Sequence, residues 1–268
     1  MAQAELFYLE LMLKLEKVRK MEKLNESIPR ASAGIKMDYY RKIAIIVGVL
    51  YIIGTVAGIL SVGFIGPILN TPDYLVKTSA NANQVIIGAL FVLIMGLALA
   101  LVPVMMFPIS RKHNEALALG YVVFRGALET VTYLATVICW LFLVPLSQAY
   151  VQAGALDPSN FQALGALLMD SNVISFTRSF VFGIGALMFY YMLYQSKLVP
   201  RWISGWGLIA IIPNTAQGLL VMFGLIQPSS STIDVLYLPM FAQEMVLAVW
   251  LIFKGFNPSV IAKSPHVE

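Results

Sequence analysis

The side chains in this sequence best suited to chemistry are an arginine and a glutamate that interrupt one long hydrophobic segment, residues 117–145. Arg125 and Glu129 have i,i+4 spacing, so on a helix they lie one turn apart and can form an ion pair. Other polar side chains recur at steps of three and four residues and form a stripe on the same helical face: Tyr121, Thr132, Tyr133 and Thr136. The stripe should face other helices or a water-filled cavity, because an ionised side chain at the centre of a bilayer costs roughly 2.5–3.5 kcal/mol.

Polar residues also interrupt three other hydrophobic segments. Arg178 lies near the start of one of them, where it is either an anchor at the membrane interface or a side chain that faces the bundle. Asn214 and Gln217 follow Pro213, which removes a helical hydrogen bond and leaves nearby carbonyl groups open to other partners. The candidate buried polar site therefore comprises Arg125, Glu129, Thr132, Tyr133, Arg178, Asn214, Gln217 and Glu244.

Glu244 has no basic residue three or four positions away, so its charge must be met from another helix. We expect Arg125 to meet it, in one network with Glu129. Because one arginine does not neutralise two carboxylates, either Arg178 joins as a fourth member or one glutamate holds a proton. The first arrangement favours a structural or ligand-binding core, and the second favours a proton or cation site.

The composition is that of a polytopic membrane protein. Hydrophobic residues make up 59% of the 268 positions, charged residues only 12%, and the mean hydropathy is +0.80. The formal charge of +4 comes largely from basic residues near the ends of the hydrophobic segments, which indicates membrane topology rather than a nucleic-acid partner. The single cysteine, Cys139, excludes an intrachain disulfide and a cysteine-based metal site, and we expect no cofactor.

Six apolar segments are each long enough to cross a hydrocarbon core of ~30 Å as a helix. They cover roughly residues 43–69, 85–109, 117–145, 173–194, 203–226 and 236–253. Residues 1–42 hold nine lysines and arginines, whereas the three loops expected on the opposite side hold only Lys77. The positive-inside rule therefore predicts an all-α, six-helix bundle in the cell membrane with both termini cytoplasmic. The outward loop 146–172 should carry a short helix, FQALGALLM, at the membrane interface.

Residues 1–36 differ from the rest of the chain. Charged residues alternate there with Leu and Met, and a proline, a serine and a glycine within residues 29–34 break the helical pattern. We therefore expect a cytoplasmic amphipathic helix and a linker, then a membrane domain over residues 37–257 and a cytoplasmic tail over residues 258–268. Because Met37 opens a run of aromatic and basic residues before the first apolar segment, residues 1–36 are expected to be an optional extension.

Several stretches together carry a family resemblance: RKIAIIVGVLYIIGTVAG, GPILNTPDYL with SANANQVIIGAL, FPISRKHNEALALGYVVFRGALE, LVPRWISGWGLI and QEMVLAVWLIFKGFN. With these stretches the chain resembles, over about residues 39–257, the bacterial and archaeal integral membrane proteins grouped as domain-of-unknown-function family 4386. The resemblance implies six or seven spans and no assigned activity. It leaves residues 1–36 outside, and it places Arg125, Glu129 and Glu244 within the stretches that carry it.

Three classes of function compete for this sequence. An intramembrane enzyme would need a nucleophile with a base, a metal cluster or paired carboxylates; none is evident in the spans, so we expect no enzymatic activity. A small transporter or an ion- or proton-conducting protein could use the polar core, although the two halves show no convincing inverted repeat. We favour a non-enzymatic sensor or partner module. Its partners would be the lipid bilayer and either another membrane protein or a small or lipidic ligand; oligomerisation stays open.

Overall fold

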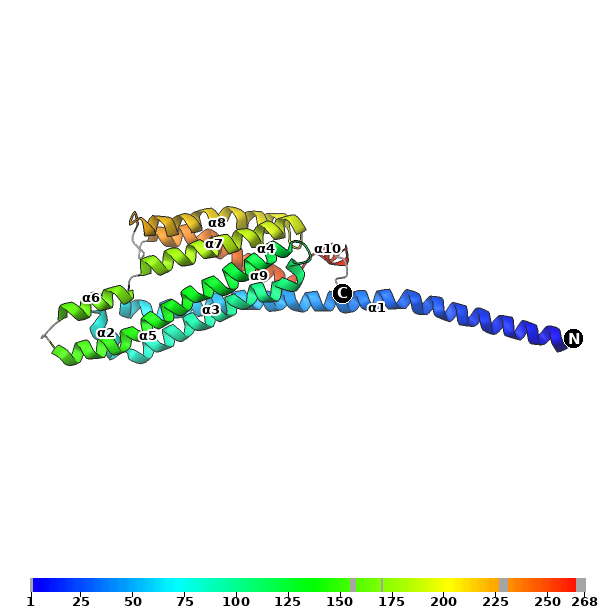
Figure 1. The fold of residues 1–268 in the computed structure, drawn as a ribbon, viewed down its shortest axis with the longest axis horizontal. Helices are drawn as coiled ribbons and strands as arrows, with labels where there is room; N and C mark the ends of the chain where they lie inside the picture. Colours follow the sequence, from blue (N-terminus) through cyan, green and yellow to red (C-terminus); the bar gives the residue numbers. More distant parts are fainter. Residues whose placement is uncertain (1, 155–157, 170, 227–230, 264–268) are drawn as a thin grey trace.

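The computed structural model describes residues 2–154, 158–169, 171–226 and 231–263, and every regular element within these ranges is helical (Figure 1). In chain order the elements are α1 (Ala2–Leu69), α2 (Tyr74–Ala80), α3 (Ala82–Ser110), α4 (Glu115–Tyr121), the π-helix η1 (Val122–Leu128), α5 (Glu129–Ala153), α6 (Pro158–Met169), α7 (Ser171–Ser196), α8 (Arg201–Met222), α9 (Ser231–Phe253) and α10 (Pro258–Lys263). The predicted all-α class is confirmed.

Six helical stretches among the described residues are long and apolar enough to cross a membrane. They are Asp38–Leu69, Ala82–Ser110, Glu115–Ala153, Phe176–Ser196, Arg201–Met222 and Thr232–Phe253. All six overlap the predicted segments, and the third is longer than predicted because α4, η1 and α5 run on as one helix. The fifth ends earlier than predicted, before Gly224, whose φ of 68° is a left-handed conformation that ends a helix.

Helix α1 is uninterrupted from Ala2 to Leu69, so the linker predicted within residues 29–34 is wrong. A single proline has a φ angle that suits a helix and removes one hydrogen-bond donor, which can bend a helix without ending it. Serine and glycine lower helix propensity by less than about 1 kcal/mol each, and strong helix formers flank both. The helical backbone therefore passes through the stretch that the sequence pattern marks as a break.

The six spans form two layers, with α1, α3 and α5 in one and α7, α8 and α9 in the other (Figure 1). The layers touch where α1 meets α9 and where α4, η1 and α5 meet α7. These contacts lie toward the end of the bundle that carries α10, called here the α10 end. The opposite end, called the α6 end, carries α2, α6 and the link between α8 and α9.

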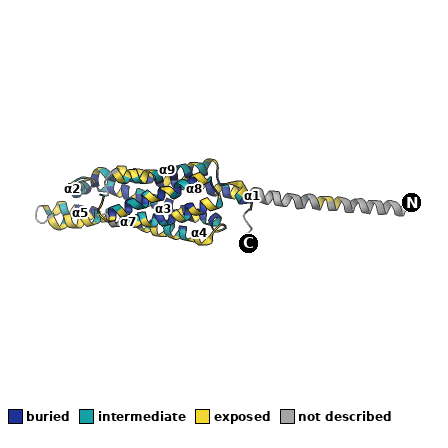
Figure 2. Cartoon of the chain, turned by 90° about the horizontal axis from the view of Figure 1, so that it is seen from above, coloured by how far each residue is buried: buried dark blue, intermediate teal, exposed yellow. Residues whose placement is uncertain are grey.

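Glycines allow the helices of the first layer to approach closely. A Cβ atom on Gly54 would lie 2.9 Å from Leu99 of α3, and one on Gly58 would lie 2.9 Å from Met95. Exposed apolar side chains cover the outer helical faces (yellow in Figure 2), for example Ile209 at 68% exposure. Contact with lipid is favourable for such an apolar surface, whereas its contact with water is unfavourable.

Short helices cover the α6 end. Helix α6 forms where the sequence predicts a short helix in the loop 146–172, and its Phe161 packs edge-on against Tyr150 of α5. Helix α2 (Tyr74–Ala80), in contrast, lies in a stretch for which the sequence predicts a loop without regular structure.

The α10 end is held by Arg41 of α1. Its guanidinium donates hydrogen bonds to the carbonyl oxygens of Leu251 at 3.1 Å and Phe253 at 3.2 Å, which lie in the last turn of α9. The last carbonyls of a helix lack intrahelical hydrogen-bond partners and carry partial negative charge. An arginine at this position supplies both the missing hydrogen bonds and a compensating positive charge. The contact fixes α1 to α9 at this end.

Candidate functional site

Arg125 joins two carboxylates at mid-depth in the bundle. Its Nη1 donates to both carboxylate oxygens of Glu129 at 2.8 Å, and its Nη2 donates to Oε1 of Glu244 at 2.9 Å. The three side chains are 3%, 2% and 9% exposed, so the structure brings these charges together in one buried network. Charge-assisted hydrogen bonds of this length are strong, and the planar guanidinium can serve two carboxylates at once.

A π-helical turn, η1, carries Arg125. The backbone N–H of Glu129 donates to the carbonyl of Phe124, five residues back, instead of four. Helix α7 approaches closely here, because a Cβ atom on Gly185 would lie 3.1 Å from the backbone nitrogen of Arg125. π-Helical turns are rare and occur frequently at functional sites. The spacing of hydrophobic residues does not distinguish a π-helical turn from an α-helical one, so this turn was not predicted from the sequence.

Tyrosine and threonine side chains around Glu129 have different roles. The Tyr133 hydroxyl donates to Oε1 of Glu129 at 2.8 Å and so belongs to the charge network. The Thr132 hydroxyl donates to the backbone carbonyl of Glu129 at 2.7 Å, and Thr136 donates to the carbonyl of Thr132. Thr132 is therefore a buried helix-bonding residue, and among the predicted site residues it is the one that does not line the cavity described below.

Arg178 faces the bundle instead of acting only as an interfacial anchor. Its guanidinium carbon lies 5.7 Å from the centre of the Tyr133 ring, within the range of a cation–π contact. Among the described residues, however, it forms no ion pair with Glu129 or Glu244. The structure thus does not form the net-neutral quartet that the sequence analysis left open.

Asn214 and Gln217 lie on α8 beyond Pro213 and are both buried. Gln217 donates its Nε2 to Oδ1 of Asn214 at 3.1 Å, while its Oε1 is buried with no hydrogen-bond partner in the described part of the chain. Buried polar atoms normally find a partner, so an orphaned carbonyl oxygen marks a place where a donor is missing.

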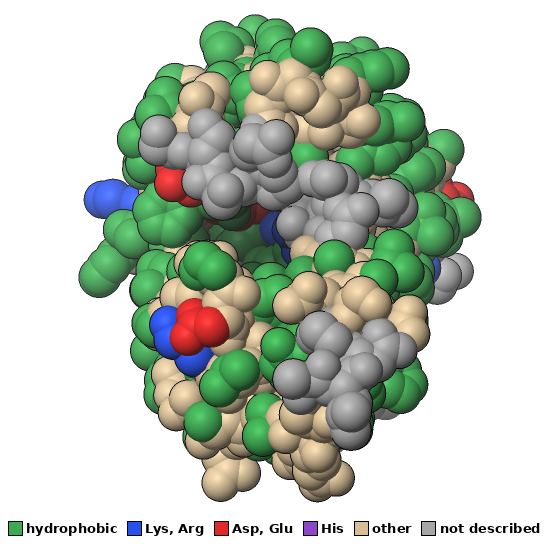
Figure 3. All heavy atoms as spheres, turned by 90° about the vertical axis from the view of Figure 1, so that its left-hand side faces the viewer, with side chains coloured by type: hydrophobic (Ala, Val, Ile, Leu, Met, Phe, Trp, Pro, Cys, Tyr) green, Lys and Arg blue, Asp and Glu red, His purple; other side chains and the backbone are tan. Residues whose placement is uncertain are grey.

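A cavity of about 740 Å³ connects these residues. It lies between the two layers, and Figure 3 shows the hollow at the α6 end, with acidic and basic atoms at its edge. The polar and charged side chains that line it are Thr55, Ser61, Arg125, Glu129, Tyr133, Thr136, Arg178, Ser179, Asn214, Gln217, Asp234, Tyr237 and Glu244. Its volume falls in the range of small-molecule sites in proteins, about 300–1,000 Å³.

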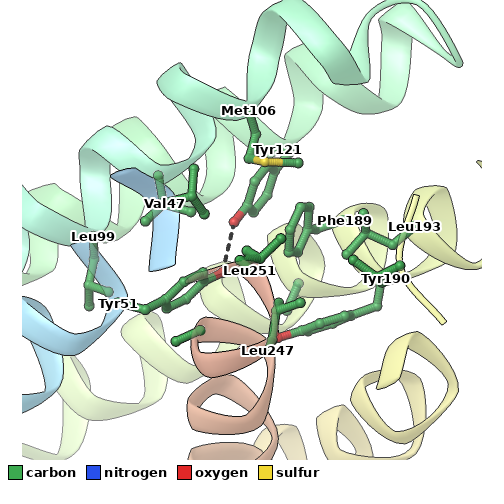
Figure 4. Close-up of a cluster of buried hydrophobic side chains, with 14 of the residues drawn as sticks. Val47, Tyr51, Leu99, Met106, Tyr121, Phe189, Tyr190, Leu193, Leu247 and Leu251 are labelled. Atoms are coloured by element: carbon green, nitrogen blue, oxygen red, sulfur yellow. Dashed lines mark hydrogen bonds between the residues drawn. The ribbon is translucent and has the colours of Figure 1, made fainter. Parts of the chain in front are cut away.

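Packed aromatic residues form a buried cluster next to the charge network, toward the α10 end (Figure 4). Tyr121 stacks on Phe189 with ring centres 4.4 Å apart, and its hydroxyl lies 3.3 Å from that of Tyr51. Tyr190 donates to Oε1 of Gln243 at 2.6 Å, and Gln243 donates to the backbone carbonyl of Ile203. These side chains are buried. They are called here the aromatic floor, because they lie at the end of the polar core opposite the opening of the cavity.

The site also contains three residues that were not predicted from the sequence: Asp234, Tyr237 and Phe182. Asp234 and Tyr237 line the cavity from the first turns of α9, and the Phe182 ring lies 4.4 Å from the guanidinium carbon of Arg125. The pattern Asp234, Tyr237, Phe241, Glu244 has steps of three and four residues and marks one face of α9. That spacing was the signal available in the sequence.

Six apolar helices that enclose a charged core define a multi-pass integral membrane protein. The chain belongs to the family described as domain of unknown function DUF4386, whose family model matches residues 46–255. The resemblance noted in the sequence is thus confirmed, and the matched stretch contains the whole charge network. No curated protein and no solved structure matches the chain.

Proposed function

We propose that this protein is a non-enzymatic binding module of the cell membrane, a sensor or a partner of another membrane protein, which takes a small ligand into the cavity between its two layers. The observation that carries the proposal is the cavity itself, which reaches from the α6 end to Arg125, Glu129 and Glu244. If the ion pair had only a structural role, we would expect close packing around it and no large cavity beside it, because well-packed interiors leave few gaps larger than a water molecule.

The side chains of the core support binding rather than catalysis. Arg125 holds both carboxylates by short hydrogen bonds, and this arrangement orients charges for recognition. A general base or nucleophile would need a reacting partner within hydrogen-bond reach. The charged network instead resembles the few well-placed polar groups that fix a ligand's orientation in an otherwise apolar pocket.

The distribution of basic residues supports an outward-facing cavity. The links at the α10 end hold Arg111, Lys112, Lys197 and Arg201, whereas the described residues that connect helices at the α6 end hold Lys77. By the positive-inside rule, both termini and the α10 end face the cytoplasm, and the mouth of the cavity faces outward. A ligand would then arrive from outside the cell or from the outer leaflet.

One observation favours a second candidate, a proton- or cation-conducting transporter. Glu129 and Glu244 share one arginine, so the network carries a formal charge of −1 when both carboxyls are ionised. A proton or cation would restore neutrality, as in many membrane-embedded relays. Transport would also require Tyr51, Tyr121 and Phe189 to separate, since they form a buried cluster next to the charge network, toward the α10 end.

Native mass spectrometry tests the binding proposal on protein extracted from its membrane in detergent-free nanodiscs. We compare the wild type with Thr136→Phe, which adds a phenyl ring to the cavity wall, and with Leu134→Phe, a control at a position on the same helix that is 39% exposed. We expect a small-molecule adduct on the wild type and on the control, and its loss from Thr136→Phe. Equal adducts on all three proteins, or none on any, would contradict the proposal.

A further inference from the structure

The charges that line the cavity do not cancel. Arg125 and Arg178 supply two positive charges, whereas Glu129, Glu244 and Asp234 supply three negative ones when ionised, so the lining carries a formal net charge of −1. In a cavity with low-dielectric walls, a single uncompensated charge acts over several ångströms and selects the sign of what binds. The net charge therefore favours a cation over an anion.

Two residues that line the cavity each have an acceptor atom without a hydrogen-bond donor among the residues that the structure describes. Oε1 of Gln217 is buried without a hydrogen-bond partner in the described part of the chain. Glu244 accepts from Arg125 through Oε1, and for its Oε2 no hydrogen bond occurs among the described residues. Oε1 of Gln217 is sealed from the cavity, so Oε2 of Glu244 is the acceptor that a ligand can reach. When Glu244 is ionised this atom only accepts, so a group that binds it must donate. Ammonium groups donate up to three hydrogen bonds and accept none.

Aromatic rings from α9 also line the cavity. Tyr237 and Phe241 occupy the same face of α9 as Glu244, with ring centres 6.4 Å apart, and both line the cavity. Elsewhere in the cavity, the two aromatic rings nearest the arginines already meet cations, since Phe182 faces Arg125 and Tyr133 faces Arg178. The faces of Tyr237 and Phe241 would serve a cationic ligand in the same way.

The wall of the cavity also reaches the lipid-facing surface between α1 and α9. Ile59 and Val62 of α1 line the cavity and are also 59% and 70% exposed. Closer to the α10 end the two helices touch, because a Cβ atom on Gly48 would lie 2.6 Å from the carbonyl oxygen of Ala248. Toward the α6 end, Tyr237 of α9 also lines the cavity and is 42% exposed, so residues of both helices indicate that the cavity opens sideways there. An alkyl chain could pass there into the bilayer.

From these four features we propose that the ligand is an amphipathic amine, with a protonated amino group near Glu244 and Gln217 and an alkyl chain that leaves between α1 and α9. The inference rests on the proposed binding function and specifies its ligand class. The amino group would donate to Oε2 of Glu244 and balance the net charge, while the chain would cover the apolar wall formed by α1. Ligands with an anionic head group would instead meet the excess carboxylate charge.

The single cysteine provides the test, because Cys139 lines the cavity and is partly exposed. We measure its reaction in lipid nanodiscs with two water-soluble methanethiosulfonates, one with an aminoethyl and one with a sulfonatoethyl group, each normalised to its rate with a free thiol. We expect the cationic reagent to react about fivefold faster or more. Dodecylamine should slow the labelling about fivefold or more, and dodecanoate at the same concentration should not.

Two variants assign the preference to the core. Glu244→Gln removes one carboxylate charge from the cavity, and it should reduce the ratio of the cationic to the anionic labelling rate to less than half. Glu115→Gln makes the same replacement at an exposed glutamate outside the cavity and should leave this ratio unchanged. An anionic reagent that reacts as fast as the cationic one in the wild type, or equal protection by dodecanoate, would overturn the amine inference and leave the binding function standing. Absence of any Cys139 labelling in the folded protein would overturn both, because the cavity would then be closed to water.

Discussion

Replacement of Arg125 should show how much the charge network contributes to stability. The substitution Arg125→Ala removes three hydrogen bonds of 2.8–2.9 Å and leaves Glu129 and Glu244 as unpaired carboxylates in a buried environment. Removal of one partner from a buried ion pair typically costs about 3–5 kcal/mol, and here two carboxylates lose their partner. We therefore expect a loss of at least about 3 kcal/mol in the free energy of unfolding.

The measurement is equilibrium unfolding in mixed micelles, in which the sodium dodecyl sulfate fraction is raised stepwise and tertiary structure is followed spectroscopically. Arg178→Ala is the matched control, because this arginine also lines the cavity but forms no ion pair with the two glutamates in the described structure. We expect a change of less than about 1 kcal/mol for the control, typical of a weak cation–π contact.

A double-mutant cycle then separates the ion pair from general packing. Arg125→Ala combined with Glu129→Ala should recover part of the loss, because the double variant no longer leaves the Glu129 carboxylate buried without a cation. The coupling between the two positions should lie in the range of about 0.5–3 kcal/mol. A loss below about 1 kcal/mol for Arg125→Ala alone, or strictly additive effects in the cycle, would refute this reasoning.

Three further predictions concern topology and packing. Single cysteines at positions 77 and 112, in a Cys139→Ser background, should react with impermeant reagents from opposite sides of the membrane; labelling of both from one side would exclude the proposed orientation. Removal of residues 1–36 should leave the unfolding free energy of the membrane bundle unchanged within about 0.5 kcal/mol, as for changes outside a packed core, and a large drop in folded yield would show that this stretch supports the bundle. Gly207→Ala should destabilise by about 1–3 kcal/mol, since its Cβ would lie 2.5 Å from the Tyr190 ring, whereas Gly63→Ala, where a Cβ meets nothing within 4 Å, should be neutral or stabilising. Equal effects at both glycines would contradict the packing.

The sequence predicts the membrane helices well because each signal is local. A hydrophobic run of sufficient length specifies a span on its own, and the i,i+4 spacing of Arg125 and Glu129 specifies their pair. The contact with Glu244 could also be inferred, since a buried carboxylate without a local cation needs a distant one. These parts of the site follow from the energetic penalty of burying a charge.

Other features depend on contacts that no local pattern encodes. The π-helical turn at η1 carries Arg125, and helix α7, which is distant in the sequence, packs against its backbone. The aromatic floor joins Tyr51 and Tyr121, which are 70 residues apart in the chain. In α1 the reverse holds: a local break signal within residues 29–34 is overridden by the helical stretches on both sides.

The most direct test of the account is an electron cryomicroscopy map of the protein in nanodiscs made from its native membrane. We predict non-protein density in the cavity between Glu244 and Gln217, continued by an elongated feature between α1 and α9, with Arg125 in contact with both glutamates. A cavity filled by the protein's own side chains, or Arg125 separated from Glu244 by more than a hydrogen-bond length, would contradict the claim that this charged core is a ligand site.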